Sequence, residues 1–183
     1  QCLVGSEMCI RDSSKRRILY GMNLAKKSKR SNIILCEGNL DVVTLHQAGF
    51  DNAVATLGTA LTEEQSRLIA QYTGEVVLSY DSDAPGQAAT RRATGLLEAA
   101  GVKIRVLSIP DAKDPDEFIQ HEGCEAFEKR LEEAENSVLY EIRMKERDFD
   151  LADPQGKSDF LHEAVRRLVA IEDEIERNSY LEA

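Results

Sequence analysis

Acidic residues gather at two places where an apolar run gives way to small and polar residues. The run EGNLD (37–41) follows NIILC, and DSDAPG (81–86) follows EVVLSY. Side chains two residues apart on extended backbone point the same way, so Asp81 and Asp83 can present their carboxylates to one point. Like charges brought together repel one another unless a cation lies between them. Carboxylate oxygens without a nearby Cys or His pair favour Mg²⁺, for which Mn²⁺ can substitute.

The elements that would bring these acids together form an α/β pattern. Short β-rich runs at 32–36, 53–56, 75–80 and 103–109 predict strands, and helical patterns cover 40–48, 62–72 and 86–100. Strands separated by helices of this length predict βαβ units and a mainly parallel sheet flanked by helices. In such a sheet ligands bind beyond the carboxyl ends of the strands, which is where both acidic runs lie.

The second part of the chain has a different pattern. From about residue 114 the strands are expected to stop, and helical patterns follow at 125–135, 137–148, 157–171 and 172–180. Asp114 precedes a proline, which is a common helix start, so this residue is either a helix cap or an acidic site residue. The sequence therefore predicts an α/β domain followed by an α-helical subdomain.

The first thirteen residues, QCLVGSEMCIRDS, share neither periodicity nor composition with the rest. LVGSEMCIRDS resembles a translated transposon-based sequencing adapter, and the alternative is a disordered N-terminal arm. Either way the segment is set aside, and Cys2 and Cys9 leave with it. Cys36 and Cys124 are far apart in sequence, so neither a disulfide framework nor a zinc site is expected.

Charge is unevenly distributed along the chain. The formal net charge is −10, which taken alone argues against a nucleic-acid partner. Residues 14–30 nevertheless contain seven basic residues and no acidic one. This basic stretch is either a solvated helix face or a phosphate-binding segment. No apolar run reaches membrane-spanning length, and a cytoplasmic setting without a membrane partner is expected.

Several motifs together resemble a known family. A Glu-Gly pair after one strand and a DxD-x-x-Gly motif two strands later resemble the Toprim domain, found in primases, topoisomerases and some nucleases. Further stretches resemble the bacterial DnaG-type primases in order and spacing; they are SKRRILYG, EGNLDVVTLHQAGF, ATLGTALTEEQ, YDSDAPGQAATRRA, LSIPDAKDPDEF and EGCEAFEKRLEEA. The resemblance covers roughly residues 14–183. It divides the chain into the adapter-like 1–13, a basic end of the preceding polymerase-core subdomain at 14–31, a Toprim domain at 32–122 and a truncated helical subdomain at 123–183.

The resemblance also implies roles for individual residues. Glu37, Asp81 and Asp83 would be the catalytic metal ligands for Mg²⁺ or Mn²⁺. Asp41, Asp114 and Asp116 match further acidic positions and would support them. Lys15 and Arg16 would contact phosphates of the template or nucleotide, and Gly58 and Thr59 would bring backbone amides near the same site.

The implied activity is nucleotidyl transfer, in which a primer 3′-hydroxyl attacks the α-phosphate of a ribonucleotide with the help of bound metal. The implied partners are a single-stranded DNA template, ribonucleoside triphosphates and the RNA primer. The replicative helicase would bind through a C-terminal domain absent from this chain, and the protein would act as a monomer at the bacterial replication fork. Because other parts of a whole primase are absent, weak or no primer synthesis is expected from this chain alone.

Alternatives remain at this point. Another Toprim enzyme, such as a topoisomerase or nuclease, would use the same acids on a DNA phosphodiester. A receiver-like module would instead be phosphorylated on Asp81, although this leaves Glu37-Gly38 and the KDPDEF stretch unexplained. An interaction scaffold would use the acids only as helix caps.

Overall fold

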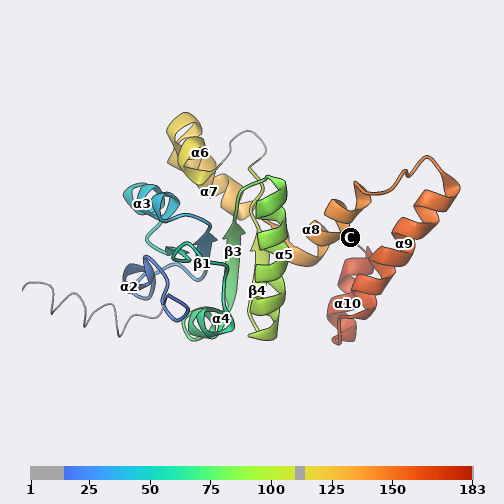
Figure 1. The fold of residues 1–183 in the computed structure, drawn as a ribbon, viewed down its shortest axis with the longest axis horizontal. Coiled ribbons are helices and arrows are strands. Elements are labelled where there is room, and N and C mark those ends of the chain that lie inside the picture. Colours follow the sequence, from blue (N-terminus) through green and yellow to red (C-terminus); the bar gives the residue numbers. More distant parts are fainter. Residues whose placement is uncertain (1–14, 110–113, 183) are drawn as a thin grey trace, which may run out of the picture. The chain divides into compact units, whose positions relative to one another are not determined.

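The computed structural model describes residues 15–109 and 114–182. The adapter-like segment at 1–13 and part of the LSIPDAKDPDEF stretch lie outside the described residues. The chain divides into two compact units, of which the first ends at Ala134 and the second begins at Glu135 (Figure 1). The first unit contains all the candidate site residues.

The first unit is built on four parallel strands, which are β1 (Ile33–Cys36), β2 (Ala53–Ala55), β3 (Glu75–Ser79) and β4 (Lys103–Val106). They lie in the order β2-β1-β3-β4. The four residues of β1 are all buried, as expected for a central parallel strand covered on both faces. The predicted parallel α/β sheet is confirmed; β1 ends at Cys36 as predicted, and the other three strands end slightly earlier than predicted.

Strand order changes direction at β1. The chain passes from β1 through helix α3 (Asn39–Gln47) to β2 on one side, whereas β3 lies on the other side of β1. This arrangement creates a topological switch point between β1 and β3, where parallel sheets open a crevice at their carboxyl ends. Glu37 directly follows β1 and Asp81 comes two residues after the end of β3, so both candidate ligands lie at the switch point.

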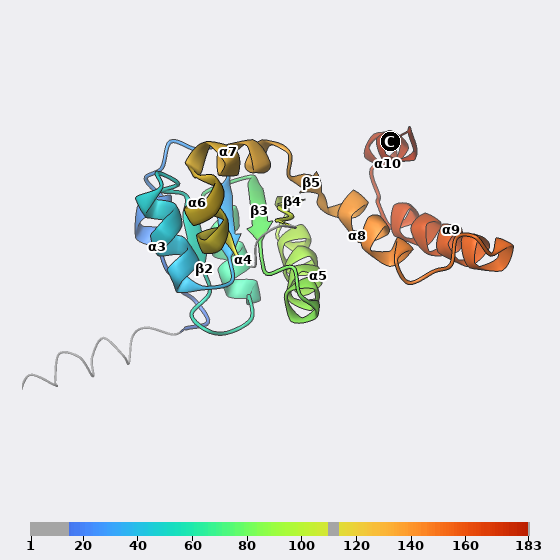
Figure 2. The same ribbon diagram turned by 90° about the horizontal axis from the view of Figure 1, so that it is seen from above.

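Helices cover both faces of this sheet. On one face, α3 packs with α6 (Pro115–Glu122), which in turn packs with α7 (Cys124–Glu132). Helices α4 (Glu63–Ala70) and α5 (Ala84–Ala99) pack with each other, and α5 lies on the opposite side of the strands from α3 in both Figure 1 and Figure 2. The site at the strand ends is therefore enclosed by helices from both layers.

Aromatic side chains fill the core under α3, α6 and α7. Phe127 of α7 is fully buried and meets Phe50 with ring centroids 5.0 Å apart and Phe118 of α6 at 6.2 Å. The same cluster includes Ile34 and Cys36 of β1, which point to this face because alternate strand residues share a side. The small Cys36 is a core residue. The cluster anchors α6 and so fixes the acidic residues at its start.

Sequence signals set several helix starts. Thr62 caps α4, where its hydroxyl accepts a hydrogen bond from the Gln65 amide and the Gln65 side chain accepts one from the Thr62 amide. These two bonds form a capping box. His46 contacts the Ala53 carbonyl through Nε2 at 2.9 Å, so it is a packed histidine.

The second unit consists of the two-residue strand β5 (Glu135–Asn136) and helices α8 (Ser137–Glu146), α9 (Pro154–Val169) and α10 (Glu174–Glu182). Helices α8 and α9 pack together and are joined by an ion pair between Lys145 and Glu163 at 2.7 Å. The rings of Phe149 and Phe160 lie 6.1 Å apart beside the connecting loop. The predicted helical subdomain is thus present.

Two small elements differ from the prediction. Strand β5 corrects the expectation that strands stop near residue 114, because two residues give too short a pattern to recognise. The four-residue helix α2 (Met22–Ala25) lies in the basic stretch and was not predicted. Across residues 15–109 and 114–182, no helix has both the length and the apolar character needed to cross a membrane.

Candidate metal centre

The backbone of the second acidic run is held close to the helix that follows it. A Cβ on Gly86 would lie 2.1 Å from the carbonyl oxygen of Asp81, which is shorter than any real contact of that kind. Residue 86 must therefore be glycine for α5 to begin where it does. This close approach fixes the backbone of Asp81 at the mouth of the switch point, and the Asp81 side chain is half-buried there.

Asp83 is the N-cap of helix α5. Its Oδ1 accepts a hydrogen bond from the Gly86 amide at 2.8 Å, and Pro85 occupies the first turn. The cap occupies one carboxylate oxygen, and the exposed side chain has its second oxygen available to another ligand. Asp83 therefore serves the fold as a cap, which is compatible with metal ligation through Oδ2.

Asp41 lies in the first turn of α3 and is buried, with 7% of its surface exposed. Its Oδ2 accepts a hydrogen bond from the Gly38 amide at 3.0 Å. Burial raises the pKa of the Asp41 carboxyl from 3.8 to about 6, the Gly38 bond opposes that rise, and the charges of Asp114, Asp81 and Asp116 add to it. The sequence ranked Asp41 behind Asp81, but the structure buries Asp41 and raises the pKa of its carboxyl.

Asp114 and Asp116 are brought to the same place by helix α6. Asp114 is the N-cap and accepts a hydrogen bond from the Glu117 amide at 2.9 Å. Asp116 accepts a hydrogen bond of 2.6 Å from the Thr44 hydroxyl on α3, and this bond lowers the pKa of Asp116. The cap interpretation of Asp114 is thus correct, and its charge still reaches Asp41.

Four aspartates therefore gather near the end of β1 and β3, and a cation would relieve their mutual repulsion. Their ligand atoms are all carboxylate oxygens, the donors that Mg²⁺ and Mn²⁺ prefer. The arrangement fits a divalent ion in that respect. In the described part of the chain, however, no three acidic, His or Cys side chains converge closely enough to form a finished metal site. Ion binding would need these carboxylates to draw together.

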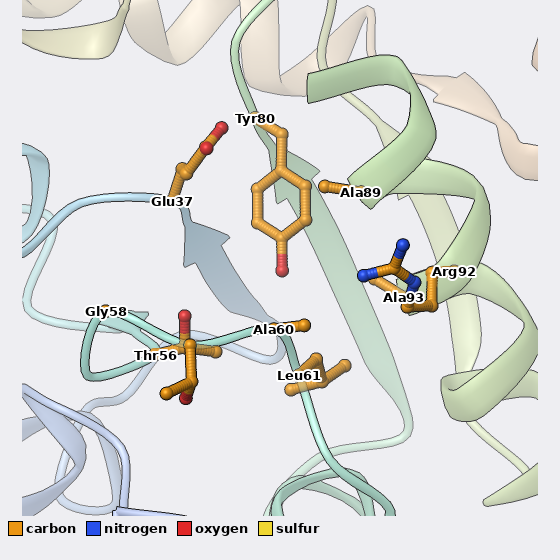
Figure 3. Close-up of a pocket in the computed structure, with 10 residues that line it drawn as sticks. Glu37, Thr56, Gly58, Ala60, Leu61, Tyr80, Ala89, Arg92 and Ala93 are labelled. Carbon is orange, nitrogen blue, oxygen red and sulfur yellow. The ribbon is translucent and has the colours of Figure 1, made fainter. Parts of the chain in front are cut away.

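The remaining predicted residues fall into two groups. Gly58 and Thr59 lie in the turn after β2 and line a pocket together with Glu37 (Figure 3). Gly58 has φ of +67°, a conformation that favours glycine. Lys15 and Arg16 have exposed side chains, and their carbonyls accept hydrogen bonds from α4, whose first turn thus fixes the basic segment.

Sequence reasoning missed three residues near this site. Thr44 lies three positions after Asp41, a spacing that puts both on one face of a helix and could have indicated a shared role. Tyr80 directly precedes Asp81 and lines the pocket. Arg92 also lines the pocket, but a single arginine on a helix surface gives no signal by itself.

Two family models match the chain. Residues 34–119 match a model described as Toprim-like, and residues 140–183 match one described as the DnaB-helicase binding domain of primase. The parallel sheet, the acidic strand ends and the first match define the class of the first unit, which is a Toprim-type α/β domain.

Known proteins narrow this class. The DNA primase of Clostridium acetobutylicum is 40% identical over 164 residues, and that of Halalkalibacterium halodurans is 36% identical over 171 residues. These alignments cover 89% and 91% of this chain but 27% and 28% of the relatives, so the chain spans about a quarter of their length.

Solved structures agree with this comparison. The Escherichia coli primase catalytic core is 31% identical with a TM-score of 0.75, over 91% of this chain and 55% of that one. The RNA polymerase domain of Mycobacterium tuberculosis primase DnaG, solved with a double-stranded DNA oligomer with an overhang, is 26% identical with a TM-score of 0.77, over 93% and 56%. The chain belongs to the DnaG-type DNA primases, as a segment of one. The expected family is confirmed over the topoisomerase, nuclease and receiver alternatives.

The second family match changes one expectation. The helicase was expected to bind through a domain absent from this chain, yet a model for the helicase-binding domain of primase covers residues 140–183. The match supports a helicase interaction and gives a candidate region for it within this chain. Helical patterns alone do not distinguish a helicase-binding region from the end of a polymerase core.

Proposed function

We propose that this chain forms the metal-dependent catalytic centre of a DNA primase, which copies a single-stranded DNA template into short RNA primers from ribonucleoside triphosphates. The observation that carries the proposal is the gathering of carboxylates at the switch point of the sheet, where Asp41 experiences the charges of three other aspartates. The primase relatives support it, since this arrangement falls within the aligned region.

Glu37, Asp81 and Asp83 are the proposed direct ligands for Mg²⁺. Asp81 would offer its carboxylate from the loop that Gly86 holds in place, and Asp83 would offer the oxygen not used as a cap. When bound, a divalent ion lowers the pKa of the primer 3′-hydroxyl and neutralises charge on the leaving pyrophosphate.

Asp41, Asp114 and Asp116 have a supporting role in this proposal. Their charges hold the local potential negative, which attracts the ion and raises its occupancy. Thr44 orients Asp116, and Gly38 orients Asp41. These hydrogen bonds keep the supporting carboxylates in place before an ion arrives.

Four further residues are the proposed contacts to nucleic acid and nucleotide. Lys15 and Arg16 would pair with phosphates of the template or nucleotide, and the Gly58 and Thr59 amides would approach the phosphates near Glu37. Residues 140–183 would contact the replicative helicase, by analogy with the domain whose model they match. We place the protein in the bacterial cytoplasm at the replication fork and propose that it acts as a monomer.

The test is a Mn²⁺ titration followed by electron paramagnetic resonance. The parent chain is compared with Asp81→Asn and Asp83→Asn. Asparagine keeps the size of both side chains and is as good an N-cap as aspartate, so α5 should still form. We expect saturable binding in the parent that each substitution weakens at least tenfold, which corresponds to about 1.4 kcal/mol.

Asp148→Asn is the matched control, because Asp148 is an exposed aspartate of the second unit. It should bind Mn²⁺ like the parent. Equal, weak binding in all four proteins would contradict the metal centre. A priming assay on the chain alone should show weak or no primer synthesis, and full synthesis by the chain would contradict the view that other parts of a primase are required.

A further inference from the structure

A pocket of about 400 Å³ is lined by Glu37 and by Tyr80, the residue before Asp81, and the metal proposal makes no use of most of it. It is enclosed by the ends of β1 and β3, the turn after β2 and helix α5 (Figure 3). Small and apolar side chains form much of its wall, namely Ala60, Leu61, Ala89 and Ala93. This volume is within the range of pockets that hold small organic ligands.

Arg92 supplies a positive charge to this pocket. Its guanidinium extends from α5 into the hollow (Figure 3). Among the residues that the structure describes, no acidic side chain forms an ion pair with Arg92. A guanidinium offers five donors in a planar fork, which matches the oxygens of a phosphate or carboxylate. The pocket thus has an available cation that fits an oxyanion.

Tyr80 adds a neutral donor. Its ring reaches across the pocket, and the hydroxyl points toward the centre, in the direction of Ala60 and Thr56 (Figure 3). A tyrosine hydroxyl carries a proton at neutral pH and can donate a hydrogen bond to a ligand.

The floor of the pocket is polar and open. Thr56 and Thr59 contribute hydroxyls, and a Cβ added to Gly58 would meet nothing within 4 Å. Glu37 lies at one edge of the pocket, with its carboxylate directed away from the Tyr80 hydroxyl (Figure 3). A ligand in this pocket would therefore find the Tyr80 hydroxyl near the centre, one cation on the α5 side and the Glu37 carboxylate at an edge.

We propose that this pocket binds the phosphate-bearing part of a mononucleotide, with Arg92 as its charge partner and the Tyr80 hydroxyl as a hydrogen-bond donor. The inference deepens the proposed function, on which it rests, because Glu37 belongs to both the pocket and the metal centre. A volume of about 400 Å³ suits the phosphates of one nucleotide, whereas a continuous strand needs a longer groove. Arg92 and Tyr80 are accordingly substrate-binding residues.

The experiment measures nucleotide affinity without metal. ATP and AMP are titrated into the whole chain in EDTA by calorimetry, for the parent, Arg92→Gln and Tyr80→Phe. We expect Arg92→Gln to weaken binding of both nucleotides at least tenfold and Tyr80→Phe to weaken it several-fold. Arg91→Gln is the matched control, since it removes the same charge from the neighbouring exposed position outside the pocket and should change affinity less than twofold.

Other outcomes overturn the proposal. Absence of nucleotide binding by the parent, or equal losses in Arg91→Gln and Arg92→Gln, would mean that the pocket does not recognise phosphate. A loss by Arg92→Gln of affinity for an oligothymidylate, without loss for ATP or AMP, would assign the contact to a DNA strand instead. Mn²⁺ binding should be unchanged in Arg92→Gln, so failure of the pocket and failure of the metal centre give separable results.

Discussion

Replacing Asp41 by asparagine should stabilise the metal-free protein at neutral pH. The folded state holds the Asp41 pKa near 6, against 3.8 in the absence of the fold. This shift of about 2 units corresponds to about 2 to 3 kcal/mol at about 1.4 kcal/mol per unit, which the folded state loses when Asp41 ionises. Asparagine keeps the acceptor for the Gly38 amide without the charge.

The sign of the pH dependence follows from linkage. Because the folded pKa is raised, the folded state binds more protons than the unfolded state between about pH 4 and pH 6. The stability that Asp41 contributes is therefore fully present below pH 4 and is lost as pH rises through 6. The advantage of Asp41→Asn should be largest at pH 7.5 and should shrink toward zero at pH 4.

Urea unfolding followed by circular dichroism in EDTA, at several values between pH 4 and pH 7.5, measures this difference. Asp148→Asn should show no comparable trend. Saturating Mg²⁺ should then reduce or reverse the advantage, since an ion that binds the folded parent more tightly stabilises it by mass action. Our reasoning is refuted if Asp41→Asn is the less stable protein in EDTA at pH 7.5, or if its advantage is the same at pH 4.

Two further substitutions test the supports of the site. Thr44→Val removes the hydroxyl that donates to Asp116, and we expect the free energy of unfolding in urea at pH 7.5 to fall by about 1 kcal/mol. Thr44→Ser should retain most of the stability. No loss in the valine variant would mean that the bond contributes nothing. Phe127→Ala removes a fully buried ring and should lower the free energy of unfolding of the first unit by about 3 to 5 kcal/mol. Thermal unfolding measures this difference. A loss below about 1 kcal/mol would show that the core collapses around the gap.

The sheet could be predicted from sequence because its strands are buried runs of distinct composition. Ile33–Cys36 is apolar throughout, and the acidic residues directly after it mark its end. Parallel pairing then follows from the helices between strands, and the switch point follows from the pairing. The strand β5 could not be predicted, because two residues have no periodicity to detect.

The orientation and burial of the individual carboxylates could be predicted less completely from the sequence. Spacing predicted that Asp81 and Asp83 share a direction, but the capping bond to Gly86 also governs where Asp83 points. The burial of Asp41 depends on how α6 packs against α3, which is a tertiary contact without a local signal. Arg92 faces the pocket for the same kind of reason, since only the packing of α5 beside β3 decides which face of that helix the pocket meets.

Gly86 lets the acidic loop and helix α5 pack so closely that they form one rigid segment. The backbone of the helix touches the Asp81 carbonyl with no side chain between them. Arg92 lies six residues further along the same helix, about 9 Å at the rise of an α-helix. Movement of α5 therefore carries the loop and the guanidinium together, and the span between them stays constant. The loop and helix together therefore set the distance between a group bound at the carboxylates and a group bound in the pocket.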